Sequence, residues 1–482
     1  YFGQATADLW SQLYLTAALR NDGFSSFGLS SQRHWFPKAS AAWVFHQTPA
    51  SGGGLFSYGK LRLAYGETGT EPLPYSTGQW YSVGTSFADA GWGSTLLENQ
   101  NGQGGLSIGA QKAQPNLAPE RTKELEAGVD YALFDQKVDG GVTFYNDRSV
   151  GVIFQAPLAN STGFFTQAQN AATLRNRGIE ATLNWRPITN QTIKWDMGVQ
   201  FGWNQNRVIS LAGQQFVDLA TIGSFTGAVA TAWGDTADHN MSDHQVGVLR
   251  GNDFARCGRG VVLPDGTSLD QTYCKDAPAN AMYIGPDGFP ILDPQQRVIS
   301  IGNPDWTGSF HTSVTFHKVS FSALVDHKQG GQVWNGTKGA LYNFGAHKDT
   351  DIRGESRVFG STWLPGPTVG PGAGTPVVLD QNWFQGLGSG FGPVGTQFVE
   401  SGTYTKLREL AVSYTFNGNW VRDLGLSTLD VRLAGRNLVT WTKYSGIDPE
   451  TNLAGAQAAI QGVDYFNNPQ TRSFVIDLGL NR

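Results

Sequence analysis

The strongest constraint on the fold is an alternation of apolar and polar residues that repeats along most of the chain. In NRGIEATLNWRPITNQTIKWDMGVQFGWNQN, residues 176–206, one side carries Ile179, Leu183 and Trp185, and the other carries Glu180. Because successive side chains of a β-strand point to opposite faces, this stretch predicts two amphipathic strands joined by a tight turn. The pattern recurs in roughly thirteen segments bounded by turn residues, so an all-β fold is expected.

The connections between these strands alternate in length. Short links are expected near residues 135–137, 187–192, 317–318 and 417–426, and long ones at about 67–121, 212–305, 330–401 and 442–469. Outer-membrane barrels have short periplasmic turns and long extracellular loops. A soluble sandwich or propeller is the alternative, but a propeller shows a repeat of ~40 to 50 residues, and none is visible. The sequence therefore favours a transmembrane antiparallel β-barrel.

Composition bears on what the two strand faces meet. No stretch reaches the ~18 to 20 consecutive apolar residues of a membrane helix, so any membrane span must be a strand. The polar faces carry Glu, Asp, Arg and Lys, which would be costly in a dry core, so we expect the apolar faces to contact lipid and the polar faces to line an interior. A net charge of −5 without basic tracts argues against a nucleic-acid partner.

Several stretches, taken in order, resemble the SusC/RagA-type TonB-dependent transporters. They are YLTAALRNDGFSSFG, FPKASAAWVF, LRLAYGETGT, ERTKELEAGVDYALFDQKVDGGVTFYNDRSVGVIFQAPLANSTGF, QNAATLRNRGIEATLNWRP, IGNPDWTGSFHTSVTFHKVSFSALVDHKQGGQVWNGT, VESGTYTKLRELAVSYTF and LDVRLAGRNLVTWTKYSGIDPET. The resemblance implies a barrel of the size class of plugged outer-membrane transporters, about 22 strands, of which residues 1–482 would form the C-terminal portion. The plug and the TonB-contacting segment would then lie outside this chain.

The same resemblance implies a function and its partners. A SusD-like surface lipoprotein would close over the outer loops, TonB would supply energy through the plug, and an oligosaccharide or peptide nutrient would be imported across the bacterial outer membrane. Two alternatives stay open. One is a TonB-dependent receptor for a siderophore, cobalamin or another metal complex, and the other is a structural barrel in a surface assembly. Since no catalytic motif is present in the sequence, we do not expect an enzyme.

Aromatic residues in the predicted outer loops are the candidates for substrate contact. Flat rings beside amide and carboxylate groups suit the apolar faces and hydroxyl edges of sugars, and they suit peptides nearly as well. For each ring, packing within its own loop is the alternative. The candidates are Trp80, Tyr81, Trp92, Trp334, Trp363, Trp383 and Phe384.

Two further groups lie in the long loop 212–305. Cys257 and Cys274 are expected to form a disulfide, worth roughly 3 kcal/mol for a loop of this size, and free or metal-bound thiols are the alternative. No cofactor is expected, although a loop Ca²⁺ is conceivable because carboxylate oxygens are its usual ligands. The candidate ligands for such a metal are Asp235, Asp238, His239, Asp243 and His244.

Overall fold

The structure is a computed structural model, and it describes most of the chain. The described residues are 1–26, 33–47, 55–83, 86–89, 93–96, 99–100, 103–104, 106–211, 216–221, 229–233, 245–361, 364–455 and 459–482.

One antiparallel sheet contains the long strands, and each strand pairs with the next long strand in sequence. The path through the sheet has thirteen strands, with the short β11 (Gln111–Lys112) pairing parallel to β14 beside it. The number of strands predicted from the alternation is therefore confirmed. The path is β1 (Phe2–Leu9), β2 (Leu13–Gly23), β3 (Arg33–Gln47), β4 (Phe56–Thr70), β12 (Glu120–Leu133), β13 (Val138–Pro157), β14 (Thr166–Thr189), β15 (Ile193–Leu211), β21 (Trp306–Phe316), β22 (Val319–Gln329), β28 (Tyr404–Phe416), β29 (Thr428–Thr442) and β31 (Ser473–Asn481).

The turns at one end of the strands are short, as the sequence predicts. His317 adopts a positive φ of 53° in the two-residue turn between β21 and β22, the backbone geometry that a tight hairpin requires. The side chain of Asn190 accepts hydrogen bonds from the backbone amides of Thr192 and Ile193 and so closes the turn between β14 and β15. The link between β28 and β29 contains the short helix α4 (Asn419–Asp423).

The long connections also lie close to their predicted positions. The strand ends place them at residues 71–119, 212–305, 330–403 and 443–472. The first is shorter than expected because β4 and β12 pair in register from Thr70 and Glu120 onward. Two outer connections stay short: the link between β2 and β3, residues 24–32, and the link between β13 and β14, residues 158–165.

The apolar face of the sheet is exposed along its strands. Val199 on β15 is 45% exposed and Leu183 on β14 is 41% exposed, whereas soluble proteins rarely leave extended apolar patches open to water. A face of this kind fits contact with acyl chains. Other exposed members are Leu15, Leu19, Trp43, Leu61, Leu63, Leu125, Val142, Phe144, Ile179, Trp185, Phe201, Phe310, Phe316, Phe321, Val412, Leu433, Trp441, Ile476 and Leu478.

We expect Val199→Asp to impair assembly more than Gln200→Asp. Val199 pairs with Phe310 on the exposed apolar face, whereas Gln200 pairs with Ser309, whose hydroxyl donates to the Gln200 side chain. A Lys or Arg charge at the bilayer midplane costs about 2–4 kcal/mol, and Asp costs less. The yield of folded, heat-modifiable protein in outer-membrane fractions measures the difference. Equal yields for the two variants would contradict the assignment of the faces.

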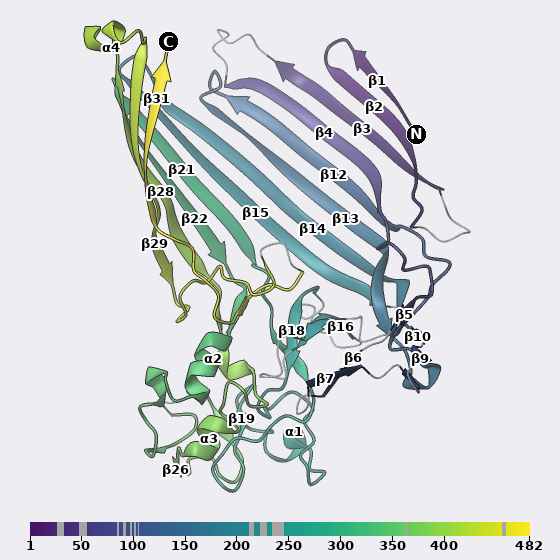
Figure 1. Cartoon of the computed structure of the whole chain (residues 1–482). Helices are drawn as coiled ribbons and strands as arrows, with labels where there is room; N and C mark the ends of the chain where they lie inside the picture. The colour runs from purple at the N-terminus through teal and green to yellow at the C-terminus, as the bar shows by residue number, and fades with distance from the viewer. Residues whose placement is uncertain are drawn as a thin grey trace. The chain divides into compact units, whose positions relative to one another are not determined.

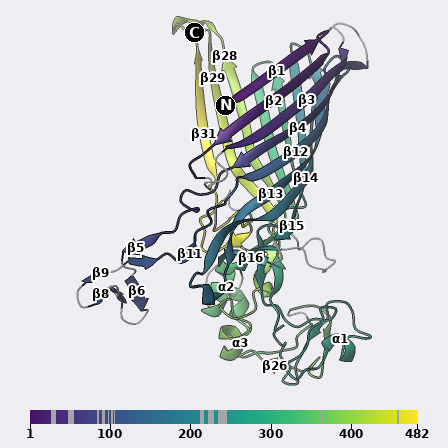
Figure 2. The same cartoon turned by 90° about the vertical axis from the view of Figure 1, so that its right-hand side faces the viewer.

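The chain divides into two compact units. Unit 1 comprises residues 1–184, 204–217 and 234–239, and unit 2 comprises residues 185–203, 218–233 and 240–482. In unit 2, β21, β22, β28, β29 and β31 lie side by side, with helices α2 (Gly336–Asn343) and α3 (Gln381–Gln385) beyond one end of the strands and α4 at the other end (Figures 1 and 2). None of the described helices has the length and the apolar character needed to cross a membrane.

Three long loops of unit 2 fold together. We call the described residues of 245–305, 330–403 and 443–472 the loop layer. Short strands join the three loops. Within the loop 330–403, β23 (Gln332–Asn335) pairs with β27 (Val399–Ser401), and β23 also pairs with β30 (Val463–Asp464) of the loop 443–472. The loop 245–305 joins them through β19 (Met282–Tyr283), which pairs with β25 (Thr368–Val369). Other short elements are β18 (Val248–Gly251), α1 (Leu269–Thr272), β20 (Arg297–Ser300), β24 (Ser356–Arg357) and β26 (Val377–Val378).

Candidate functional site

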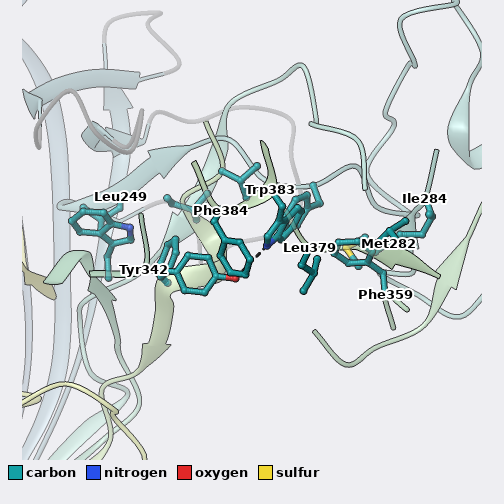
Figure 3. Close-up of a cluster of buried hydrophobic side chains, with 14 of the residues drawn as sticks. Leu249, Met282, Ile284, Tyr342, Phe359, Leu379, Trp383 and Phe384 are labelled. Atoms are coloured by element: carbon teal, nitrogen blue, oxygen red, sulfur yellow. Dashed lines mark hydrogen bonds between the residues drawn. The ribbon is translucent and has the colours of Figure 1, made fainter. Parts of the chain in front are cut away.

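The loop layer has a hydrophobic core of its own. Trp383 is 2% exposed, and its indole ring stacks near Phe254 and Phe289, with ring centroids 6.4 and 6.0 Å away. It also meets Phe359 edge to face, with ring centroids 5.0 Å apart; both residues are labelled in Figure 3. Buried aromatic side chains are the largest single contributors to such a core. Ile460 and Val463 of the loop 443–472 are buried in the same core, so the three loops form one packed body.

A hydrogen bond inside this core fixes the central ring. The indole Nε1 of Trp383 donates to the hydroxyl of Tyr342 on α2 over 3.2 Å (Figure 3). Burial raises the pKa of Tyr342 to about 12, so its hydroxyl stays protonated at neutral pH. The polar ends of both aromatic side chains are thus satisfied within the core.

The structure separates the predicted aromatic contacts into two groups. Trp334, Trp383 and Phe384 are 3%, 2% and 4% exposed, so they are part of the loop core and are closed to a dissolved ligand. The structure therefore contradicts the prediction that these three side chains contact substrate. Trp80 and Tyr81 are 46% and 61% exposed in unit 1, where the Trp80 indole donates to the carbonyl of Tyr75. Substrate contact by these two residues stays a prediction.

The remaining predicted site residues lie outside the described part of the chain. They are Trp92, Trp363, Asp235, Asp238, His239, Asp243 and His244.

The two cysteines form a disulfide in the loop layer. Cys257 and Cys274 are joined with a Cα–Cα distance of 5.5 Å, and Asp270 lies beside them. These three residues are the one group with metal-ligand spacing among the described residues. Because disulfide sulfurs are not thiolate ligands, and the Asp270 carboxylate accepts the amides of Gly258 and Gly260, this group organises the loop instead of binding a metal.

A buried network of charges fastens the loop 443–472 to the polar face of the sheet. Lys406 on β28 is 3% exposed, and its Nζ lies 2.8 Å from Asp448 Oδ1 and 2.5 Å from Glu450 Oε2. The neighbouring Arg408 donates to Asp326 on β22 over 2.6 Å and also to Glu450. Two strands and one outer loop therefore share the same set of ion pairs, which we call the anchor network.

A β-bulge places Arg408 in this network. Leu324 and Val325 of β22 are opposite Glu409 and Leu407 of β28, so β28 has one extra residue at Arg408. As a result both Arg408 and Glu409 reach partners on the polar side, since Glu409 pairs with Arg432 of β29.

Glu450 is ionised over almost the whole pH range. Burial alone would raise its pKa, but the hydrogen bonds from Arg408, Lys406 and Tyr404 outweigh burial and lower the pKa to about 2. Tyr404 contributes through its hydroxyl, which donates to Glu450 Oε1 over 2.6 Å. The carboxylate is therefore the centre of the anchor network.

Acidification is expected to loosen the loop 443–472. The pKa of Glu450 is lowered in the folded state from its ordinary value of 4.5, so the ionised group stabilises the loop above that pH. This stabilisation is lost as the pH falls toward about 2. Hydrogen exchange of the loop amides, compared at each pH with Glu450→Gln, should show a gap that closes between these two values. A constant gap would contradict the role of Glu450.

A second set of contacts links the same loop to α2. Tyr444 donates to Asp464 Oδ2 over 2.5 Å, and Thr337 donates to the other oxygen of Asp464 over 3.0 Å. Burial, reinforced by the hydrogen bond to Asp464, raises the pKa of Tyr444. The outer loop is therefore fixed both to the strands and to the loop layer.

Sequence reasoning did not identify the anchor network. Lys406 and Arg408 were visible as two cations at alternate positions of a strand, but their acidic partners Asp448 and Glu450 lie some forty residues away in a loop. The adjacent charges Arg408 and Glu409 break the alternation, and that break was the available signal for the bulge.

The exposed apolar sheet face and the packed loop layer define an integral membrane protein that crosses the bilayer with strands. The family described as TonB-dependent receptor-like, β-barrel matches residues 1–438. The chain belongs to this family, and the expected barrel fold, SusC/RagA type and outer-membrane location are confirmed.

Two relatives and one solved structure illustrate the similarity. TonB-dependent receptor P3 of Formosa agariphila is 25% identical over 99% of this chain and 45% of its own length. TonB-dependent receptor SusC of Bacteroides thetaiotaomicron is 27% identical over 44% of this chain and 21% of its own length. The RagAB peptide importer in its closed-closed state matches with a TM-score of 0.69 at 19% identity, over 99% of this chain and 47% of that chain, which is a likeness of fold.

The chain thus spans about half the length of two of these proteins, 45% of P3 and 47% of the matched chain of the RagAB importer. The relatives carry names of receptors and transporters and none is named as an enzyme, which agrees with the lack of a catalytic motif in the sequence.

Proposed function

We propose that this chain supplies part of the barrel wall and the outer loops of a TonB-dependent importer of nutrients. The observation that carries the proposal is the packed loop layer at one end of membrane-spanning strands, in a chain of this receptor family. A loop surface with its own core keeps its shape, and a preorganised surface binds a ligand at a lower entropic cost than mobile segments do.

The proposed substrate is an oligosaccharide or a peptide. SusC-type and RagA-type relatives support this choice, and the solved RagAB complex is described as a peptide importer. The exposed rings of Trp80 and Tyr81 offer flat apolar surfaces of the kind that sugar faces and peptide side chains contact. A siderophore, cobalamin or other metal complex is the competing ligand class, and a structural role without transport is the competing function.

The proposed partners are a SusD-like lipoprotein over the outer loops and TonB on the periplasmic side. Tagging the full-length protein in its own membrane and purifying it in mild detergent should recover a surface lipoprotein in near-equal amount. Uptake of labelled oligosaccharides or peptides should require an intact TonB system. Recovery without a lipoprotein and without TonB-dependent uptake would favour the structural role, and uptake of ferric chelates alone would favour the receptor alternative.

A further inference from the structure

The loop layer of unit 2 contains a pocket that none of the described aromatic candidates lines. Its volume is about 400 Å³, which is within the usual range for ligand pockets. Its lining includes the polar residues Arg256, Arg259 and Gln397 together with apolar residues such as Met282 and Ile299. A pocket of this size and composition suits one end of an oligomeric ligand.

The charges in the pocket do not cancel. Asp253, which is 4% exposed, lies 2.6 Å from Arg259 Nη1 and 3.6 Å from Arg256 Nε. Its second oxygen accepts the hydroxyl of Thr396 over 2.6 Å and the amide of Phe254 over 2.7 Å. One carboxylate thus faces two guanidinium groups, and these three side chains leave one positive charge in the pocket.

The two arginines also keep hydrogen-bond donors available. A guanidinium has five N–H donors in a planar fork. Among the described residues, Arg256 donates to the carbonyl of Asn280 over 3.3 Å, and Arg259 donates to Asp253. Most of their donors therefore have no partner in the described part of the chain, and a planar anion is the complementary ligand.

The backbone that carries both arginines is held in place. Cys257 lies between them in sequence and is cross-linked to Cys274, and Asp270 accepts the amides of the two glycines that flank Arg259, Gly258 over 2.6 Å and Gly260 over 2.8 Å. A disulfide and two charge-assisted hydrogen bonds restrict a segment of a few residues. The backbone positions of Arg256 and Arg259 are thus restricted before a ligand arrives.

We propose that this pocket binds a carboxylate group of the imported ligand, with Arg256 and Arg259 as its donors. The proposal rests on the proposed import function and names a substrate class for it: a ligand with a free carboxylate, either a uronic acid or a peptide C-terminus. The apolar residues of the lining then contact the residue that bears the carboxylate, while Asp253 holds Arg259 in position.

Arg256→Gln is the variant that tests the pocket. Arg256 is the more distant partner of Asp253, so after its replacement the buried carboxylate still pairs with Arg259 and accepts the hydroxyl of Thr396. The loop around Asp253 is therefore expected to stay folded. Arg353→Gln is the matched control, because Arg353 belongs to the same loop layer but donates to the carbonyl of Gly345 and does not line the pocket.

The experiment measures binding to the full-length transporter in detergent by isothermal titration calorimetry. The probes are trigalacturonate and its methyl ester, and penta-alanine and its C-terminal amide. We expect at least one acid to bind about tenfold more tightly than its neutral counterpart, and Arg256→Gln to remove that difference while Arg353→Gln keeps it. The pair that shows the difference identifies the source of the carboxylate.

The carboxylate site would be contradicted if acid and neutral probes bound with equal affinity in both pairs, or if no probe bound at all. It would also be contradicted if Arg256→Gln lowered the affinity equally for both members of a pair. A loss of the acid preference in Arg353→Gln as large as in Arg256→Gln would be the third contrary result. The import proposal is tested separately, because recovery of the lipoprotein and TonB-dependent uptake do not depend on these four probes. A transporter that keeps both properties but binds acid and neutral probes equally retains its function and loses the carboxylate site.

Discussion

Replacing Lys406 with methionine is expected to release the loop 443–472 from the strands, at a cost of about 3–5 kcal/mol, the usual loss when one partner of a buried ion pair is removed. The ammonium group is 3% exposed and touches two carboxylates, of which Asp448 is itself 7% exposed. Without the cation, the Asp448 carboxylate keeps only the backbone amides of Glu450 and Gln470 as donors among the described residues. Hydrogen exchange of the loop amides in the purified protein measures the release.

Two further variants make this result specific. Lys318→Met removes an exposed ammonium group that bonds Asn417, and we expect it to cost less than about 1 kcal/mol. Lys406→Met combined with Asp448→Leu removes both charges, and it should recover a large part of the loss, because apolar residues can replace a buried pair at little cost. Fast exchange that persists unchanged in the double variant would mean that packing, and not the charge, holds the loop.

Trp383→Ala is expected to open the core of the loop layer while the membrane-spanning strands stay folded. The indole is 2% exposed, contacts three phenylalanine rings and donates to Tyr342, and replacing a buried Trp by Ala costs about 3–5 kcal/mol. The backbone at Gly388 also packs directly against the indole ring of Trp383, since a Cβ added to Gly388 would overlap that ring. Limited proteolysis should therefore cut the loop layer, and the heat-modifiable gel shift of the barrel should remain.

Trp420→Ala is the control for this variant. Trp420 lies on α4, is 49% exposed and contacts Phe416, so its loss should change stability by about 0.5 kcal/mol or less and leave the proteolysis pattern unaltered. Loss of the gel shift in Trp383→Ala would show that the loop layer and the strands do not fold separately, which would contradict the expectation.

The strands could be predicted from the sequence because a physical rule links composition and position along them. Side chains alternate between two solvents, so residues such as Leu183 and Glu180 reveal the face to which they belong without any knowledge of their neighbours. Turn residues, such as Asn190, end each strand through contacts within a few positions. Both signals are local, and local signals can be read from the sequence.

The loop layer followed no such rule. Its aromatic residues have the composition of a binding surface and of a core alike, and only contacts over long sequence distances separate the two. Trp383 and Tyr342 meet across 41 residues, and Asp253 and Thr396 across 143 residues. For the same reason the pairing of Lys406 with Asp448 could not be predicted, whereas the two cysteines of the chain, 17 residues apart in one loop, leave a single possible pairing.

The extra residue at Arg408 determines how many ions this part of the protein can hold. In a strand without a bulge, every second side chain faces the lipid, so either Arg408 or Glu409 would have to point into the hydrocarbon. The extra residue keeps both charged side chains away from the lipid, and the alternation of apolar lipid-facing residues continues on either side of it. At such a bulge, more than every second residue of the strand can present a charged side chain to the interior, without placing a charge in the bilayer.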